Sequence, residues 1–364
     1  MTKPRLGVVL FQLGGPDSPE AVEPFLYNLF CDPDIINFMG AWLARRPLAR
    51  WIAHRRAAIV REHYDAIGGQ SPIRELTGRQ ARGLEAALAP DFDARCFIAM
   101  RYWHPLTQEA VEAVRSTALD SPFEKLVLLP LYPQYSFATT LSSLKEWRRV
   151  SALTRTQTRA ASPAPGQRPP REVVIEEFHL HPQYIAALVP RIETALARFS
   201  DRGGVHLVFS AHGLPLSLIA RGDPYQRHVE ETVAAVMARG RWPNSHTLCF
   251  QSRVGRQKWL EPSLTHTLER LPREGKRHLL IIPISFVTEH IETLHEINIE
   301  ARAHALASGV EQFEVMPALD DSPEFIAALA ALVRAAVAAE PAAAAASAST
   351  KPAAIPQEPQ EKVR

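Results

Sequence analysis

The chain has 364 residues, of which 46% are hydrophobic and 22% are charged, and its 41 Lys and Arg residues against 39 Asp and Glu residues leave a net charge of +2. This composition is typical of a globular protein with a sizeable core, and it excludes wholesale disorder. The near-neutral charge argues against a dedicated nucleic-acid-binding protein, in which basic residues gather on one face. The length suggests two domains.

Strand-like apolar runs recur along the chain, beginning at 6–13, and each is followed by a helical pattern. Continuous apolar runs are typical of strands that are buried on both faces. Their alternation with helices predicts an α/β protein built from two Rossmann-like halves, each with a doubly wound parallel sheet. The other strands are expected at 96–100, 125–131, 173–178, 205–210, 247–251, 278–286 and, more weakly, 312–316.

Two proline-rich segments mark the organisation of the chain. Residues 155–171, RTQTRAASPAPGQRPPR, predict an exposed loop or a hinge. We therefore expect an N-terminal half at 1–170 and a C-terminal half at 171–340. The final segment, 341–364, has four prolines and eight alanines without apolar periodicity and is expected to be disordered.

The cysteines and the ends of the chain indicate the compartment. Cys31, Cys96 and Cys249 are far apart and odd in number, so no disulfide framework is predicted. The N-terminus runs directly into a strand-like segment without the apolar core of a signal peptide. Phe325–Val333, the longest apolar stretch near the C-terminus, is much shorter than the roughly 20 residues that span a bilayer. We expect a cytoplasmic protein that does not span a membrane.

Ligands of open α/β sheets bind beyond the carboxyl ends of the strands, so the residues that follow each predicted strand are candidate site residues. Gly14 and Gly15 follow the first strand but lack the GxGxxG spacing of a dinucleotide site. The other strand ends carry imidazole, carboxylate, guanidinium and aromatic groups, which suit an anionic, partly apolar ligand and a metal. They are Arg101, Tyr102, Tyr132, Gln134, Ser136, His212, Ser252, Arg253, Glu289, His290 and Glu292.

Three glutamates are spaced four residues apart just after the predicted strand 278–286. Glu292, Glu296 and Glu300 would stack along one face of a helix and form an acidic ladder. An ordinary solvated helix face is an equally good interpretation of the spacing alone. Near His290 and His295, however, the ladder also offers the imidazole and carboxylate groups that bind first-row divalent metals and accept protons.

The segment 30–56, which we call the lip, mixes large apolar side chains with arginines. It fits either a pair of ordinary amphipathic core helices or an apolar lip with a basic rim. Such a lip could hold a flat apolar acid or contact an anionic membrane surface. Its apolar members are Ile35, Ile36, Phe38, Met39, Trp42, Leu43, Leu48, Trp51 and Ile52, and its arginines are Arg45, Arg46, Arg50, Arg55 and Arg56.

Seven strings in this order along the chain resemble the ferrochelatase family, whose members insert Fe²⁺ into protoporphyrin to make haem. The resemblance runs from Leu13 to about Ile297 and covers most of the folded chain. The combination of FSAHGLP, QSRVG with WLEP, and FVTEHIETL is highly specific. The strings are LGGPDSPEAV, GGQSPI, MRYWHPLTQEAV, LPLYPQYS, FSAHGLPLSLIARGDPYQ, FQSRVGRQKWLEP and PISFVTEHIETLHEI.

The resemblance implies a chelatase-like fold and a role for particular residues. His212 of SAHGLP matches the family's active-site histidine, and Glu292 of HIE matches its carboxylate partner, with Glu296 and Glu300 continuing the ladder. These two residues are the implied catalytic and metal-binding groups. The implied substrate-binding residues are Leu13, Arg56, Tyr64, Ser71, Arg101, Tyr102, Trp259, Phe286 and His290, of which Leu13 stands where relatives often carry Met or an aromatic residue.

The resemblance also implies the ligands. Protoporphyrin IX and Fe²⁺ would be substrates, no cofactor would be bound permanently, and no nucleic acid would be a partner. Some family members carry a [2Fe–2S] cluster on four cysteines, but this chain has only three, none in its last hundred residues, so the cluster is expected to be absent. A coproporphyrin-specific ferrochelatase, a chelatase for Co²⁺ or Ni²⁺, and a non-catalytic tetrapyrrole-binding protein remain alternatives.

Metal insertion must remove two pyrrole protons and deliver a dehydrated metal ion, and bending the planar ring would expose its nitrogen lone pairs. His212 and Glu292 are the expected acceptor and partner, but the sequence leaves open which of them holds metal and which takes protons. Arg56, Tyr64 and Ser71 match the positions that hold the porphyrin propionates.

Overall fold

The computed structural model describes residues 3–32, 41–157, 170–252 and 257–346. Several predictions fall outside these ranges: Ile35, Ile36, Phe38 and Met39 of the lip, Arg253, most of the 155–171 loop, and the tail from 347 onward. The disordered tail is predicted from residue 341, but the last helix continues to Ala346.

The N-terminal half is a four-stranded parallel sheet with the strand order β2-β1-β3-β4. Strand β1 is a central strand and pairs in parallel with β2, from Arg5 opposite Asp93 to Gln12 opposite Met100. Helices fill the connections on both faces, as doubly wound topology requires. The elements are β1 (Arg5–Gln12), α1 (Val22–Cys31), α2 (Ala41–Asp65), α3 (Ile73–Leu88), β2 (Asp93–Met100), α4 (Thr107–Asp120), β3 (Lys125–Pro130), the π-helix η1 (Phe137–Leu141), α5 (Ser142–Gln157) and β4 (Arg171–Val174).

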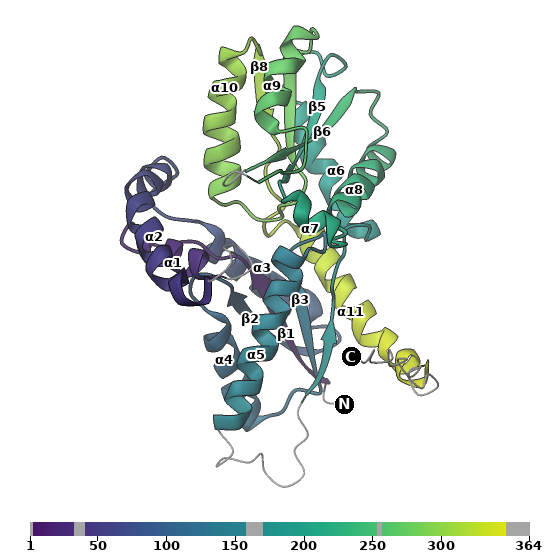
Figure 1. The fold of residues 1–364 in the computed structure, drawn as a ribbon. Helices are drawn as coiled ribbons and strands as arrows, with labels where there is room; N and C mark the ends of the chain where they lie inside the picture. The colour runs from purple at the N-terminus through teal and green to yellow at the C-terminus, as the bar shows by residue number, and fades with distance from the viewer. Residues whose placement is uncertain (1–2, 33–40, 158–169, 253–256, 347–364) are drawn as a thin grey trace, which may run out of the picture.

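The C-terminal half repeats this plan with the parallel strand order β6-β5-β7-β8. The two sheets form the two lobes of the molecule (Figure 1). The elements are α6 (Pro182–Leu196), β5 (His206–His212), α7 (Leu216–Ala220), α8 (Tyr225–Gly240), β6 (His246–Gln251), α9 (Leu264–Arg273), β7 (His278–Pro283), the π-helix η2 (Glu292–Ala301), α10 (Arg302–Ala307), β8 (Gln312–Val315) and α11 (Pro323–Ala346).

All eight predicted strands are present, which confirms the predicted fold class of two parallel-sheet halves. One strand differs in place and partner. The run predicted at 173–178 forms a strand only at Arg171–Val174, and this strand pairs with β3. The strand expected to open the C-terminal half therefore completes the N-terminal sheet, and the chain crosses between the sheets after β4.

Helix α11 connects the halves: it leaves the C-terminal lobe and runs along the N-terminal one (Figure 1). Phe325, Leu329 and Val333 on one face of this helix are fully buried. They belong to a single hydrophobic core cluster that also contains residues of both sheets. This shared core fixes the two sheets relative to each other and so positions the site between them.

The lip is partly an ordinary packed helix. Ala49 and Ala53 of α2 are buried in one cluster with Phe25 and Phe30 of α1, whereas Trp51 is 57% exposed. Within the described residues, no helix combines the length and the apolar character needed to cross a bilayer.

Candidate active site between the two halves

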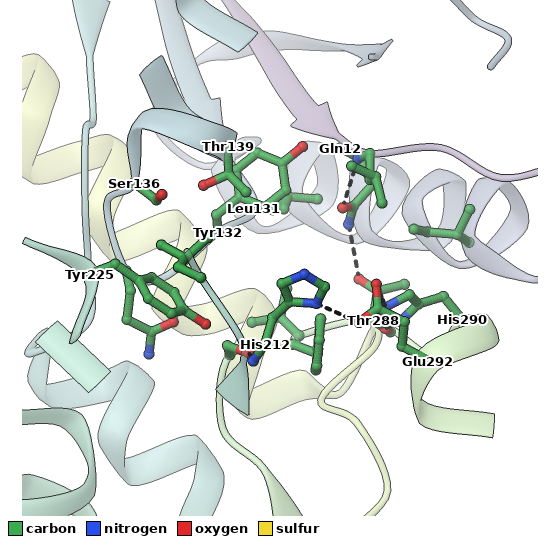
Figure 2. A pocket seen from close by; sticks show the side chains of 17 residues that line it. Gln12, Leu131, Tyr132, Ser136, Thr139, His212, Tyr225, Thr288, His290 and Glu292 are labelled. Atoms are coloured by element: carbon green, nitrogen blue, oxygen red, sulfur yellow. Dashed lines mark hydrogen bonds and ion pairs between the residues drawn. The ribbon is translucent and has the colours of Figure 1, made fainter. Parts of the chain in front are cut away.

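His212 is the last residue of β5, a central strand of the C-terminal sheet. Its Nδ1 lies 2.7 Å from Oε2 of Glu292 (Figure 2). The next residue, Gly213, passes so close to β6 that a Cβ atom there would lie 2.7 Å from the Gln251 carbonyl oxygen. Only glycine lets the chain turn away at this point and leave the imidazole at the edge of the sheet.

Glu292 is the first residue of η2 and arrives from the neighbouring strand β7 through the loop 284–291. Its carboxylate also accepts hydrogen bonds from Ser252 Oγ at 3.3 Å and Gln251 Nε2 at 3.5 Å. His290 Nε2 lies 3.8 Å from its other oxygen. The side chain is only 13% exposed, so these neighbours replace the water that a buried carboxylate loses.

Ser252 joins the first two members of the acidic ladder, because its Oγ also lies 2.6 Å from Glu296 Oε2. Its backbone φ is 58°, in the left-handed region that is unfavourable for residues other than glycine. Strained residues of this kind cluster at functional sites. The strained turn after β6 points a hydroxyl group at both carboxylates.

The third glutamate of the ladder contacts different partners from the other two. Glu300 is 52% exposed, and its Oε1 lies 3.6 Å from His295 Nδ1 and 3.8 Å from His63 Nε2. Residues 292–301 form a π-helix, whereas the prediction assumed an α-helix.

The ionisable groups of the site influence one another strongly. Burial alone would lower the pKa of His212, but the charge of Glu292 and its hydrogen bond outweigh burial and raise that pKa. Burial would raise the pKa of Glu292, but the charge of His212 holds it well below its usual range. Burial and the neighbouring charge of Glu292 raise the pKa of Glu296 to about 7. The site therefore holds a hydrogen-bonded His–Glu pair, in which each group favours the charged form of the other, beside a carboxyl group that exchanges its proton near neutral pH.

A cavity between the halves has the His212–Glu292 pair in its wall (Figure 2). Most of its other walls are apolar or carry uncharged hydrogen-bonding groups. The N-terminal half contributes Gln12, Leu13, Ile73, Leu131, Tyr132, Gln134, Ser136 and Thr139, and the C-terminal half contributes His212, Leu214, Tyr225, Ser285, Phe286, Val287, Thr288, His290 and Glu292.

The structure brings several predicted site residues to this cavity. Leu13, Phe286 and His290 line it together with His212 and Glu292. The Phe286 ring meets the imidazole of His212 edge-on at 6.3 Å between centroids.

Two further predicted residues lie near the site, Tyr64 close to the carboxylates and Trp259 beside the turn that follows His212. Tyr64 is buried, and its pKa is raised by burial and by the nearby charges of Glu292 and Glu296. Trp259 pairs by backbone bridging with Pro215, and its ring would touch a Cβ atom at Gly213.

Other predicted residues lie away from the cavity wall. Arg101 and Tyr102 are both held by Asp32, with Nη2 and the phenol oxygen each 2.7 Å from Oδ2. Ser71 is buried beneath Gly15 and its hydroxyl accepts from the backbone of its own turn. Arg56 is exposed and stacks over Phe30 at 5.7 Å. None of these groups lines the cavity as the structure describes it.

Several polar residues at the cavity were either missed or noted only as residues that follow a predicted strand. Tyr132, Gln134 and Ser136, after β3, were among the candidates at strand ends, whereas Gln12, the last residue of β1, was missed although the same signal was available for it. Thr139, Tyr225 and Ser285 come from a π-helix, a helix start and a loop, where no periodic pattern identifies them. Ser252 was noted only as a residue after a strand.

Two parallel α/β halves that close over a His–carboxylate pair define an enzyme that handles protons or metal at the edges of its sheets. Comparison with known proteins gives the family. The ferrochelatase family model matches residues 5–337. The chain therefore belongs to the ferrochelatase family, whose members are metal-inserting lyases acting in haem biosynthesis.

Curated relatives are similar over nearly their whole length. The ferrochelatase of Geotalea uraniireducens is 47% identical over 339 residues, which are 92% of this chain and 99% of that protein. The ferrochelatase of Citrifermentans bemidjiense is 46% identical over 91% of this chain and 98% of its own. A solved chelatase-like protein of Deinococcus radiodurans, DR2241, aligns with a TM-score of 0.48 at 13% identity, covering 91% of this chain and 54% of its own.

Proposed function

We propose that this protein inserts Fe²⁺ into protoporphyrin IX to form protohaem. The observation that carries the proposal is the His212–Glu292 pair, with 2.7 Å between Nδ1 and Oε2, in the wall of a largely apolar cavity between the halves. A flat apolar macrocycle needs such walls, and its metallation needs an acceptor for two pyrrole protons. Both substrates, the porphyrin and Fe²⁺, are implied by the family.

In this proposal the three ionisable groups divide the work. His212 uses Nδ1 to contact Glu292, which leaves its other ring nitrogen to take protons from the macrocycle. Glu292 stays ionised and stabilises the imidazolium that forms. Glu296 has a pKa of about 7 and passes protons onward toward Glu300 and solvent. The same carboxylates offer oxygen ligands to the incoming Fe²⁺.

The choice of protoporphyrin over coproporphyrin rests on charge. None of the described residues that line the cavity is Lys or Arg. Coproporphyrin carries four propionates and protoporphyrin two, so coproporphyrin would place more carboxylates where no cation offsets their desolvation. The apolar side chains Leu13, Ile73 and Leu131 suit vinyl and methyl groups better.

An anaerobic assay tests the proposal. Purified protein is mixed with Fe²⁺ and either porphyrin, and metalloporphyrin formation is followed by absorbance. We expect turnover with protoporphyrin and a kcat/KM at least about tenfold lower with coproporphyrin. Faster insertion into coproporphyrin would make this a coproporphyrin ferrochelatase. Tight porphyrin binding without insertion of any divalent metal would make it a carrier and contradict the proposal.

We also propose that α2 contacts anionic membrane surfaces. Trp51, Arg55 and Ile59 are spaced four residues apart and share one helix face. Trp51 is 57% and Ile59 58% exposed, and the Arg55 guanidinium lies 5.2 Å from the Trp51 ring. Exposed aromatic and aliphatic groups beside a cation are typical of interfacial helices.

Sedimentation with vesicles that contain anionic lipid tests this contact. Replacing Trp51 and Ile59 with Ser should release the protein from the vesicles. Leu119→Ser is the matched control, because Leu119 is 73% exposed on α4. Equal binding of all three proteins would contradict the contact.

A further inference from the structure

A second cluster of metal-ligating side chains lies outside the cavity, where the segment after β4 meets helix α8. Glu177 and His179 belong to that segment, and His228 and Glu231 are three residues apart on α8. One ligand atom from each of Glu177, His179 and His228 lies within 4.8 Å of the others. The imidazole rings stack at 3.9 Å with an interplanar angle of 9°.

The hydrogen bond of His179 decides which of its nitrogens is free. Its Nε2 lies 2.9 Å from Oε2 of Glu231, and a carboxylate only accepts, so Nε2 carries the hydrogen. Its Nδ1 then presents a lone pair. The Oε2 atom of Glu177 lies 4.0 Å from this nitrogen, too far for a hydrogen bond. This Nδ1 is buried without a hydrogen-bond partner, on a side chain that is 6% exposed.

His228 presents a second buried nitrogen to the same carboxylate. Its Nδ1 lies 3.1 Å from Oε2 of Glu177 but is not aligned for a hydrogen bond, and its side chain is 4% exposed. Its Nε2 lies 3.4 Å from Nη2 of Arg227, which can only donate, so Nδ1 carries the hydrogen of the neutral ring, and a metal ion bound at Nδ1 would displace that hydrogen. Two buried, unpartnered imidazole nitrogens therefore face one carboxylate.

We propose that Glu177, His179 and His228 bind a divalent first-row cation, of which Zn²⁺ is the best match. Two imidazoles and a carboxylate are a common zinc ligand set. Glu231 would support the site from outside, because its carboxylate accepts the hydrogen bond of His179 Nε2. Such a hydrogen bond fixes the tautomer and the orientation of a ligating histidine. Glu177 is 45% exposed, which gives the ion a path from solvent and leaves room for water as a fourth ligand.

The bound cation would tie the crossing segment to α8. Tyr225, the first residue of α8, lines the cavity, and the preceding Asp223 accepts a hydrogen bond from Ser136 at 2.8 Å. The ion would therefore stabilise one wall of the cavity while lying apart from His212 and Glu292. It is a resident structural ion in this proposal and is independent of the metal that is inserted.

The test counts Zn²⁺ bound by the full-length protein, freed of metal and without porphyrin, by competition with a chromophoric chelator. We expect His228→Gln to bind one equivalent fewer than the wild type, and Glu231→Gln to weaken that site about 10–100-fold. Glu292→Gln should keep this equivalent, which separates the site from the cavity. His104→Gln is the matched control, since His104 pairs with Glu109 at 2.7 Å without a second imidazole.

A thermal melt guards against misfolded variants. Zn²⁺ should raise the Tm of the wild type and of His104→Gln, but not of His228→Gln. If His228→Gln fails to fold, Glu177→Gln replaces it, because Glu177 is at the surface and its substitution leaves the core intact. An unchanged Zn²⁺ count and affinity in folded Glu177→Gln and Glu231→Gln would overturn the proposal.

Discussion

The ionisable residues of the site differ in protonation because the charge of each one shifts the pKa of its neighbours. His212 gains a proton more easily beside Glu292, and Glu292 loses one more easily beside His212. Burial, and then the charge of Glu292, raise the pKa of Glu296 to about 7, so it holds its proton up to neutral pH. A His–Glu pair in which each member favours the charge of the other thus lies beside a group that titrates near neutral pH.

Glu296 gives the protein a pH-dependent stability whose sign follows from its raised pKa. The folded-state pKa of about 7 is above the ordinary 4.5, so the stabilising contribution is full below pH 4.5 and is lost as pH rises through 7. Glu296→Gln should remove this dependence and be more stable than the wild type at about pH 8, by at most about 3 kcal/mol. Urea unfolding across this pH range measures it. If the free energy of unfolding changed with pH in the same way in both proteins, the raised pKa of Glu296 would be contradicted.

Ser252 combines a hydrogen-bonding role with backbone strain, and two substitutions separate them. Ser252→Ala and Ser252→Gly both remove the hydroxyl group that contacts Glu292 and Glu296, so both should slow metal insertion equally. Glycine tolerates the φ of 58° and alanine does not, so the Gly variant should be more stable by about 1 kcal/mol. Chemical denaturation together with the insertion assay tests both parts. Equal stabilities would show that the left-handed backbone is absent.

At the scale of elements, the sequence predicted what depends on local pattern. The eight strands were recognisable because apolar runs such as Leu6–Leu10 and Leu279–Ile282 are buried on both faces. The partner of a strand is not a local property, which is why β4 was assigned to the wrong sheet. The π-helical form of η2 was also not predicted, because a spacing of four residues between the glutamates is equally compatible with an α-helix.

Helix α11 should stabilise the whole fold because its buried face joins the halves. Leu329 is 0% exposed in the core cluster that both sheets share. Leu329→Ala should lower the free energy of unfolding by about 2–5 kcal/mol through lost burial and the cavity left behind. Leu119→Ala, at a position that is 73% exposed, should change it by less than about 0.5 kcal/mol. Equal destabilisation by the two variants, measured in urea, would show that α11 does not hold the halves together.

At the scale of the whole molecule, the site depends on hydrogen bonds across the boundary between the halves. Thr288, after β7, lies within hydrogen-bond distance of Gln80 at 3.0 Å and of Gln12 at 3.5 Å. Gln134 donates to the Ile284 carbonyl oxygen at 3.3 Å. These buried uncharged groups join the two halves, and they satisfy polar atoms that would otherwise be costly to bury.

The candidate site was predictable where strand ends converge and not where distant side chains intervene. His212 and Glu292 are 80 residues apart but follow neighbouring parallel strands, so topology alone brings them together. Arg101 and Tyr102 also follow a strand, but Asp32, about 70 residues earlier at the end of α1, holds both of them. Nothing in the local sequence identifies that partner.

The most direct test of the proposed function measures insertion and binding separately in His212→Ala and Glu292→Gln. Each variant should bind protoporphyrin as the wild type does, as followed by fluorescence quenching, while kcat for Fe²⁺ insertion falls at least about 100-fold, the scale for losing a general acid–base group. The double variant should be little slower than either single one, because the two groups act as a unit. Near-normal insertion by His212→Ala with unchanged binding would contradict the account and assign proton acceptance to another group, first of all to His290, whose Nε2 lies 3.8 Å from Glu292.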